Sequence, residues 1–223
     1  LKPIFKIPFM NNSRTTFIKR STLALAGSSL LSRLSFANTN VKDNELVGIQ
    51  LYSVRDDMGK DPLGTLKQLA AMGYKHVEHA NYKDRKFYGY TPTEFKKILN
   101  DLGMKMASGH TVLGSQHWDT AKKEFTDLWK YTVEDAATMG QLYVISPSLN
   151  ESYRKDKDGL LRFMEVFNKS GELCKKSGMK FGYHNHDFEF SENLGGEMHY
   201  EIMMKNTEEK LVVQQFIIGK FYK

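Results

Sequence analysis

The sequence predicts an α/β fold, an incomplete (β/α)8 TIM barrel that begins near residue 46. Strand and helix patterns alternate along residues 46–223, which is typical of a parallel sheet with right-handed crossovers. Four of the predicted helices end at a glycine, and a strand follows at once. Polar side chains recur at the carboxyl ends of successive strands, where barrel enzymes place their active sites.

Apolar runs and helical periodicity define the expected elements. Strands are predicted over residues 46–54, 74–80, 104–110, 142–148, 179–188 and 211–218. Helices are predicted over residues 62–72, 92–102, 120–139, 160–177 and 196–206. Asp61-Pro62 and the capping-box pattern from Thr91 to Glu94 mark two helix starts. The glycines that mark helix ends are Gly73, Gly103, Gly140 and Gly178.

A doubly wound open sheet is the competing architecture. No glycine-rich phosphate loop follows the first strand, where the sequence reads YSVRDDMGKDP, so the barrel is favoured. Eight strand–helix units usually need about 250 residues, and only about five and a half units are found here. An unclosed parallel sheet would present a bare edge. We therefore expect a truncated barrel, or one that closes by pairing with another chain.

The net charge of +6 belongs to the first 37 residues. They hold six basic residues and no acidic residue, so the remainder is neutral. The zero net charge of residues 38–223 argues against a surface that binds the phosphates of nucleic acid. The chain has a single cysteine, Cys174, which excludes an intramolecular disulfide and a zinc-knuckle cluster; a buried thiol is expected.

Residues 1–37 are interpreted as an export signal. The basic stretch NNSRTTFIKR precedes the apolar STLALAGSSLL, and a small-x-small cleavage pattern ends at Ala37. SRTTFIK resembles the twin-arginine motif, although Thr15 stands where a second arginine belongs, and general secretion stays an alternative. An uncleaved amphipathic tail is the other interpretation. The hypothesis predicts a periplasmic protein with a polar linker over residues 38–45 and no membrane span in the mature chain.

The segment GYHNHDFEF places His184 and His186 two residues apart at the end of a predicted strand. Both imidazoles then point to one face, a common arrangement for a divalent metal, although structural hydrogen bonding is the alternative. Glu78 and His110 end neighbouring strands and strengthen the metal hypothesis. Glu78 is costly to bury without a metal, cation or hydroxyl partner. Glu189, beyond the strand end, is consistent with a solvated position.

Four further residues are candidates for binding substrate. Gln50 and Tyr52 share a face of the first predicted strand, so both are expected at the rim. His117 and Trp118 lie in the loop LGSQHWD and could cover a sugar ring by stacking. Packing within the loop is an equally good interpretation for this pair.

The segments GIQLYSVRDD, VEHANY, SGHTVLG and GYHNHDFEF together resemble the sugar phosphate isomerase/epimerase family, the xylose isomerase-like TIM barrels. The resemblance covers residues 46–222. It implies a Mn, Mg, Co or Zn ion acting on a sugar or keto-sugar, and exported members often resemble enzymes for keto-glycosides. In such enzymes the metal would bind adjacent oxygens, and a group such as Glu78 or His110 would move a proton next to a carbonyl.

The resemblance also implies which metal ligands to expect. The fifth-strand ligand matches His186, with His184 beside it as a substrate-binding group. The sixth-strand aspartate of the family is replaced by Ile217 in QQFIIGKFY, and the seventh- and eighth-strand ligands would lie beyond Lys223. We therefore expect a metal-dependent sugar isomerase, epimerase or lyase that is inactive as this chain stands.

Two other classes of function stay open on the sequence alone. A metal-dependent endonuclease uses the same barrel, but the neutral body and the export signal argue against it. A non-catalytic carbohydrate-binding or assembly protein, with a partner covering the open sheet, would fit the lost ligands. The sequence leaves the substrate, the metal identity and the oligomeric state open.

Overall fold

A six-stranded parallel sheet forms the centre of the computed structural model, which describes residues 48–216. All five pairings between neighbouring strands are parallel. The strands, in sheet order, are β1 (Gly48–Gln50), β2 (His76–His79), β5 (Lys105–His110), β8 (Tyr143–Ser146), β9 (Lys180–His184) and β12 (Val212–Gln215). This order confirms the predicted parallel sheet of an incomplete barrel.

The sheet curls strongly, as a barrel wall does. Gln215 Nε2 on β12 donates a hydrogen bond to Glu78 Oε1 on β2 at 2.8 Å, although β5, β8 and β9 lie between these strands. Along a flat sheet, four strand spacings would separate the two strands by roughly 19 Å. The concave face is therefore narrow enough for side chains of its two halves to meet. Within the described residues, β1 and β12 are the edges of the sheet.

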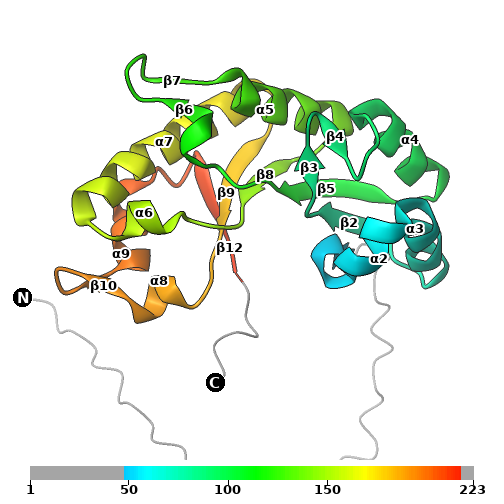
Figure 1. The fold of residues 1–223 in the computed structure, drawn as a ribbon, viewed down its shortest axis with the longest axis horizontal. Coiled ribbons are helices and arrows are strands. Elements are labelled where there is room, and N and C mark those ends of the chain that lie inside the picture. The colour runs from blue at the N-terminus through cyan, green and yellow to red at the C-terminus, as the bar shows by residue number, and fades with distance from the viewer. Residues whose placement is uncertain (1–47, 217–223) are drawn as a thin grey trace, which may run out of the picture. The chain divides into compact units, whose positions relative to one another are not determined.

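Helices cover the outer side of the curved sheet, with α4, α5 and α7 forming a continuous layer (Figure 1). Asp61 caps one helix by accepting from Gly64 N at 2.9 Å, and Thr91 and Glu94 form the predicted capping box. No helix within residues 48–216 has the length and apolar character needed to cross a membrane. The main helices are α3 (Pro62–Ala71), α4 (Pro92–Asp101), α5 (Asp127–Met139), α7 (Lys157–Lys176) and α9 (His199–Asn206).

Short elements occupy the loops at the carboxyl ends of the strands. After β1 the chain enters a 3-10 helix, η2, and after β5 it enters another, η3. Three antiparallel hairpins, β3–β4, β6–β7 and β10–β11, were not expected from the sequence. These elements are η2 (Leu51–Val54), α2 (Arg55–Lys60), β3 (Tyr82–Lys83), β4 (Lys86–Phe87), η3 (Ser115–His117), β6 (Trp118–Asp119), β7 (Glu124–Phe125), α6 (Glu151–Arg154), α8 (Phe188–Ser191), β10 (Asn193–Leu194) and β11 (Glu197–Met198).

Three predicted boundaries are wrong at these loops. The helix expected over 120–139 starts only at Asp127, because residues 118–125 form the β6–β7 hairpin. The strand expected over 179–188 ends at His184, where the chain turns into α8. The first strand ends at Gln50 rather than at residue 54. The predicted export signal (1–37), the linker (38–45) and Ile217 lie outside the described residues.

Two hydrophobic clusters fill the space between helices and sheet. One packs α5 and α7 against β8, β9 and β12, with Trp129 and Phe167 fully buried. The other packs α3 and α4 against β2 and β5, with Phe95 at its centre. Cys174 is buried in the first cluster, and burial raises the pKa of its thiol to about 12. Both clusters hold the strand ends in place beneath the loops.

Two glycine-to-alanine substitutions separate packing from helix propensity. A Cβ at Gly171 on α7 would lie 2.6 Å from both Cβ and the backbone O of Leu211, whereas nothing lies within 4 Å of one at Gly59 on α2. We expect Gly171→Ala to lower the free energy of unfolding by about 1–3 kcal/mol. Gly59→Ala should raise it by up to about 1 kcal/mol. Urea unfolding measures both, and equal effects would contradict the close approach of α7 to Leu211.

Candidate functional site

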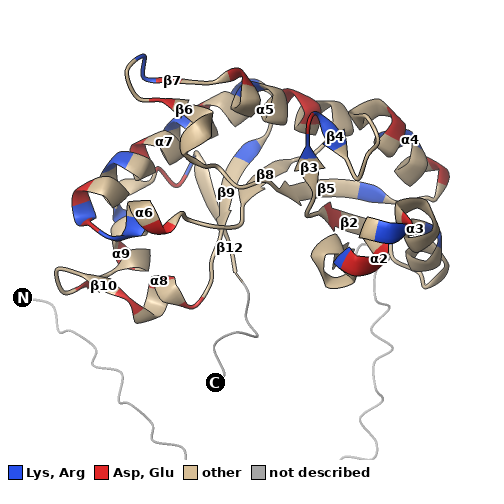
Figure 2. Cartoon of the chain, in the orientation of Figure 1, with Lys and Arg blue, Asp and Glu red and all other residues tan. Residues whose placement is uncertain are grey.

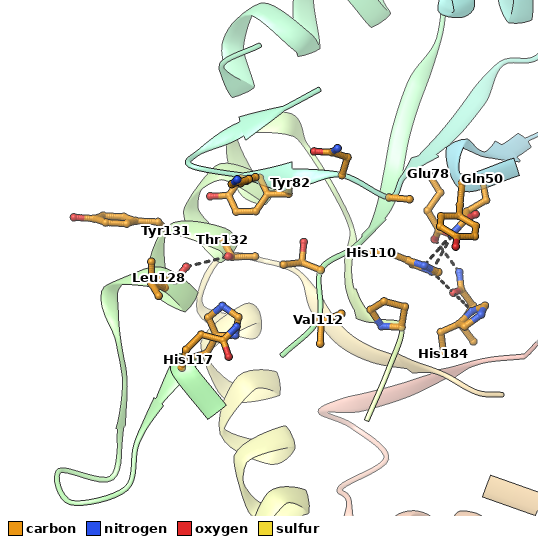
Figure 3. Close-up of a pocket in the computed structure, with 18 of the residues that line it drawn as sticks. Gln50, Glu78, Tyr82, His110, Val112, His117, Leu128, Tyr131, Thr132 and His184 are labelled. Carbon is orange, nitrogen blue, oxygen red and sulfur yellow. Dashed lines mark hydrogen bonds and ion pairs between the residues drawn. The ribbon is translucent and has the colours of Figure 1, made fainter. Parts of the chain in front are cut away.

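A cleft of about 1370 Å³ opens at the carboxyl ends of the strands. Its lining comes from β1, β2, β5, β9 and β12, and from the β3–β4 hairpin, η3 and α5. Figure 3 shows two groups of side chains. We call Gln50, Glu78, His110, His184 and Gln215 the polar end, and Tyr82, Arg85, His117, Leu128, Tyr131 and Thr132 the distal end.

Glu78 is the centre of the polar end. Its Oε1 accepts hydrogen bonds from Ser108 Oγ at 2.6 Å and from Gln215 Nε2 at 2.8 Å. Its Oε2 lies 3.1 Å from His110 Nε2. The side chain is only 13% exposed, so these partners replace the water that the carboxylate has lost.

The pKa of Glu78 is lowered to about 2. Burial is the largest single influence and would raise the pKa, but it is outweighed by the hydrogen bonds that Glu78 accepts from His110, Ser108 and Gln215. Glu78 is therefore a carboxylate at neutral pH. A base with so low a pKa is poorly matched to taking a proton from carbon.

The hydrogen bonds of His110 define its tautomer. Gln50 Nε2 lies 2.9 Å from His110 Nδ1, and an amide NH₂ can only donate there, so Nδ1 is the acceptor. His110 Nε2 faces two acceptors, Glu78 Oε2 and Gln215 Oε1 at 2.8 Å, and must carry the proton. In this arrangement His110 is neutral, and both of its ring nitrogens are already used.

Gln215 is a central site residue that the sequence did not reveal. Its Oε1 accepts from His110 and, at 2.7 Å, from His184 Nδ1, while its Nε2 donates to Glu78. An amide can do this because it carries an acceptor and a donor on one rigid group. The only signal in the sequence was its place near the end of the sixth strand, two residues before Ile217.

His184 and His186 both line the cleft, as the His-x-His spacing predicted. Their ring centroids are 5.4 Å apart, and the His184 ring is 4.7 Å from that of His110. Burial is the main cause that lowers the pKa of His184, so its imidazole is neutral at pH 7. The prediction that Glu189 is solvated is wrong. Its side chain is fully buried and accepts hydrogen bonds from His186 N, at 2.8 Å, and from the Tyr183 hydroxyl.

The remaining sequence-predicted residues divide between cleft and core. Tyr52 lines the cleft from η2 rather than from β1 and is 57% exposed. His117 also lines the cleft, and its Nδ1 accepts from Gly114 N at 3.0 Å. Trp118 is not among the lining residues; it packs edge-on against Phe125 with ring centroids 4.9 Å apart. The packing interpretation of Trp118 is the one that its contacts match.

The distal end is organised by a buried carboxylate on α5. Asp135 accepts from Arg85 Nη2 at 2.6 Å, from Arg85 Nε at 3.0 Å and from the Tyr82 hydroxyl at 2.6 Å. The Arg85 guanidinium also lies 4.3 Å from the ring centroid of Tyr131. These contacts tie the β3–β4 hairpin to α5, and no sequence motif pointed to them.

The described side chains do not fit a divalent metal. Within residues 48–216 no three His, Cys, Asp or Glu side chains are placed to hold a metal ion together. The oxygens of Glu78 and both nitrogens of His110 are engaged in the network described above. The predicted ligand His186 lines the cleft without two such neighbours to complete a site.

A family model described as "Xylose isomerase-like TIM barrel" matches residues 66–207. The chain belongs to this family. A comparison with curated protein sequences found no match. The match to the family model confirms the resemblance that the strand-end motifs indicated.

Several solved structures resemble the chain to different degrees. A sugar phosphate isomerase/epimerase from Parabacteroides distasonis is 25% identical, with a TM-score of 0.70, over 83% of this chain and 70% of its own. D-psicose 3-epimerase in the presence of D-fructose is 15% identical, with a TM-score of 0.56, over 76% of this chain and 62% of its own. The IolI protein with a bound zinc atom is 12% identical, with a TM-score of 0.54, over 74% and 60%. Because of their low identities, the similarities to the last two structures show only a shared fold.

The lowered pKa of Glu78 predicts how stability depends on pH. The carboxylate stabilises the folded protein above the ordinary glutamate pKa of 4.5, and this contribution is lost as the pH falls toward about 2. We expect the unfolding free energy of the wild type, relative to Glu78→Gln, to fall by about 2 kcal/mol between pH 6 and pH 3. Urea unfolding across this range measures it, with Glu165→Gln, an exposed site on α7, as the control for loss of one charge. If the difference in unfolding free energy between the wild type and Glu78→Gln does not change with pH, the lowered pKa of Glu78 is contradicted.

Proposed function

We propose that the polar end binds a sugar or keto-sugar, and that the chain derives from the isomerase, epimerase or lyase chemistry of its family. The observation that carries the proposal is the network around Glu78. It gathers a carboxylate, two neutral imidazoles and two amides at one rim of the cleft. Hydroxyl groups, which both donate and accept, are the ligands that suit such a mixed set.

We further propose that the chain as it stands does not turn its ligand over. Proton abstraction next to a carbonyl creates a negative enediolate, which needs a cation or strong donors nearby. At the polar end the formal charge is that of ionised Glu78, because His110 is neutral in its network. The cationic side chains that line the cleft, Lys83 and Arg85, come from the hairpin at the distal end. A second negative charge beside Glu78 would therefore be opposed.

The second candidate is a protein whose role is carbohydrate binding itself, rather than a family enzyme that has lost its turnover. It is favoured by the saturation of His110 and Glu78, which serves binding better than proton transfer. A nucleic-acid role has less support, since basic and acidic residues are interspersed along the helices (Figure 2). Export to the periplasm, predicted from residues 1–37, remains part of the proposal and suits a protein that meets extracellular sugars.

Two adjacent glutamines give a matched test of sugar binding. Gln215 lines the cleft, whereas Gln214 precedes it on β12 and points to the opposite face of the sheet. We expect Gln215→Met to weaken the binding of a methyl hexoside at least tenfold, because Glu78, His110 and His184 lose their shared partner. Gln214→Met should leave the affinity unchanged. Calorimetric titration measures both, and equal effects would contradict the site.

Solvent deuterium exchange tests the absence of turnover. Hexoses, ketoses and 3-keto-glucosides are incubated with the purified chain in D₂O, with and without added Mn²⁺, and proton NMR follows the carbons beside the carbonyl. We expect no exchange above that of a boiled sample. Exchange that His184→Gln abolishes would show that the chain is a working enzyme and contradict this half of the proposal. The binding test above stands independently of that result.

A further inference from the structure

The cleft is larger than one sugar ring requires. Its volume of about 1370 Å³ exceeds the roughly 300–1,000 Å³ of typical small-molecule sites. The polar end occupies one side of this space, and the distal end continues it along α5 and η3 (Figure 3). A ligand held at Glu78 therefore has room for a second group.

The distal end presents apolar surface to this space. Leu128 and Tyr131 on α5 are 57% and 39% exposed, and both line the cleft. They lie three residues apart and so share a face of the helix, while Trp129 and Val133 point into the core. Val112, 43% exposed, lines the cleft as well. Exposed apolar groups gathered on the wall of a cleft mark a binding surface.

Tyr131 is held as a rigid platform. The guanidinium of Arg85 lies 4.3 Å from its ring centroid, and Arg85 is itself fixed by two hydrogen bonds to buried Asp135. A cation above one face of an aromatic ring favours a fixed ring orientation. The ring is therefore oriented before any ligand arrives, which lowers the entropic cost of stacking against it.

Three polar side chains around this platform, Tyr82, Thr132 and His117, already have hydrogen-bond partners within the protein. The Tyr82 hydroxyl donates to Asp135, the Thr132 hydroxyl donates to Leu128 O at 2.9 Å, and His117 Nδ1 accepts from Gly114 N. A second sugar would need several hydrogen-bonding groups, whereas a flat apolar ring needs apolar surface. The exposed apolar side chains of Leu128, Tyr131 and Val112 therefore match an aromatic ring better than a second sugar.

We infer that the distal end is a subsite for the aromatic aglycone of a glycoside whose sugar occupies the polar end. This inference rests on the proposed sugar site and extends it by naming the ligand class, an aryl glycoside. Tyr131 and Leu128 bind the aromatic ring, and Arg85 positions Tyr131. Free monosaccharides fill only part of the cleft.

Matched glycosides test the inference. Calorimetry compares the methyl and phenyl β-glycosides of glucose, galactose and mannose with the full chain. We expect the phenyl compound of the preferred sugar to bind about tenfold more tightly. Tyr131→Ala should remove this advantage and leave the methyl glycoside unaffected, and Tyr131→Phe should retain it. Tyr143→Ala, at a site of 36% exposure that does not line the cleft, is the control.

Each other outcome has a definite meaning. Equal affinities for methyl and phenyl glycosides would overturn the aglycone subsite and leave the proposed sugar site intact. If no glycoside binds, 4-nitrophenol alone decides the question. Its binding, lost in Tyr131→Ala, would support the aromatic subsite while contradicting the sugar site. Absence of binding by 4-nitrophenol as well would overturn both.

Discussion

The burial of one carboxylate, that of Glu78, is the constraint on which the rest of the cleft depends. A carboxylate this far from water is tolerated only when fixed donors replace its hydration. Ser108 comes from the neighbouring strand, but Gln215 comes from a strand four positions away in the sheet. The curl of the sheet and the ionisation of Glu78 are therefore coupled. Without the curl, the buried carboxylate would lose the hydrogen bond from Gln215, and without the charge, Gln215 would lose the carboxylate that it binds.

Much of the fold could be predicted from the sequence because local rules determine it. Helix periodicity, caps and left-handed glycines, such as Gly140 with φ of 83°, act over a few residues and are visible in one chain. Boundaries failed where the loops carry structure of their own, as in the β6–β7 hairpin. The rim position of Glu78, His110 and His184 followed from strand alternation alone. The position of Trp118 could not be predicted in this way, because tertiary neighbours decide whether an aromatic side chain in a loop faces the cleft or the core.

The partners of these residues could not be predicted. Gln215 bonds to Glu78 across 137 positions of sequence, and Arg85 bonds to Asp135 across 50. Such contacts arise only when the sheet has curled and α5 has packed, and nothing in the local pattern distinguishes Gln215 from Gln214. Glu189 was misplaced for a related reason: the strand stops at His184, and α8 then turns this carboxylate back beneath the rim. Tertiary structure thus determines the chemistry of the site more than residue identity does.

An amide at position 215 is also consistent with the proposal that the polar end binds ligand hydroxyls, and it leaves His110 poorly placed to bind a metal. A metal bound by His110 would need a nitrogen lone pair, but Nδ1 already accepts from Gln50 and Nε2 carries the proton directed at Gln215 and Glu78. A carboxylate at 215 could not donate to Glu78 and would repel it, so the present network requires a group that both donates and accepts. A sugar hydroxyl has the same dual character and can replace one link at a time. At the proposed sugar site, binding would therefore proceed by exchange of hydrogen bonds.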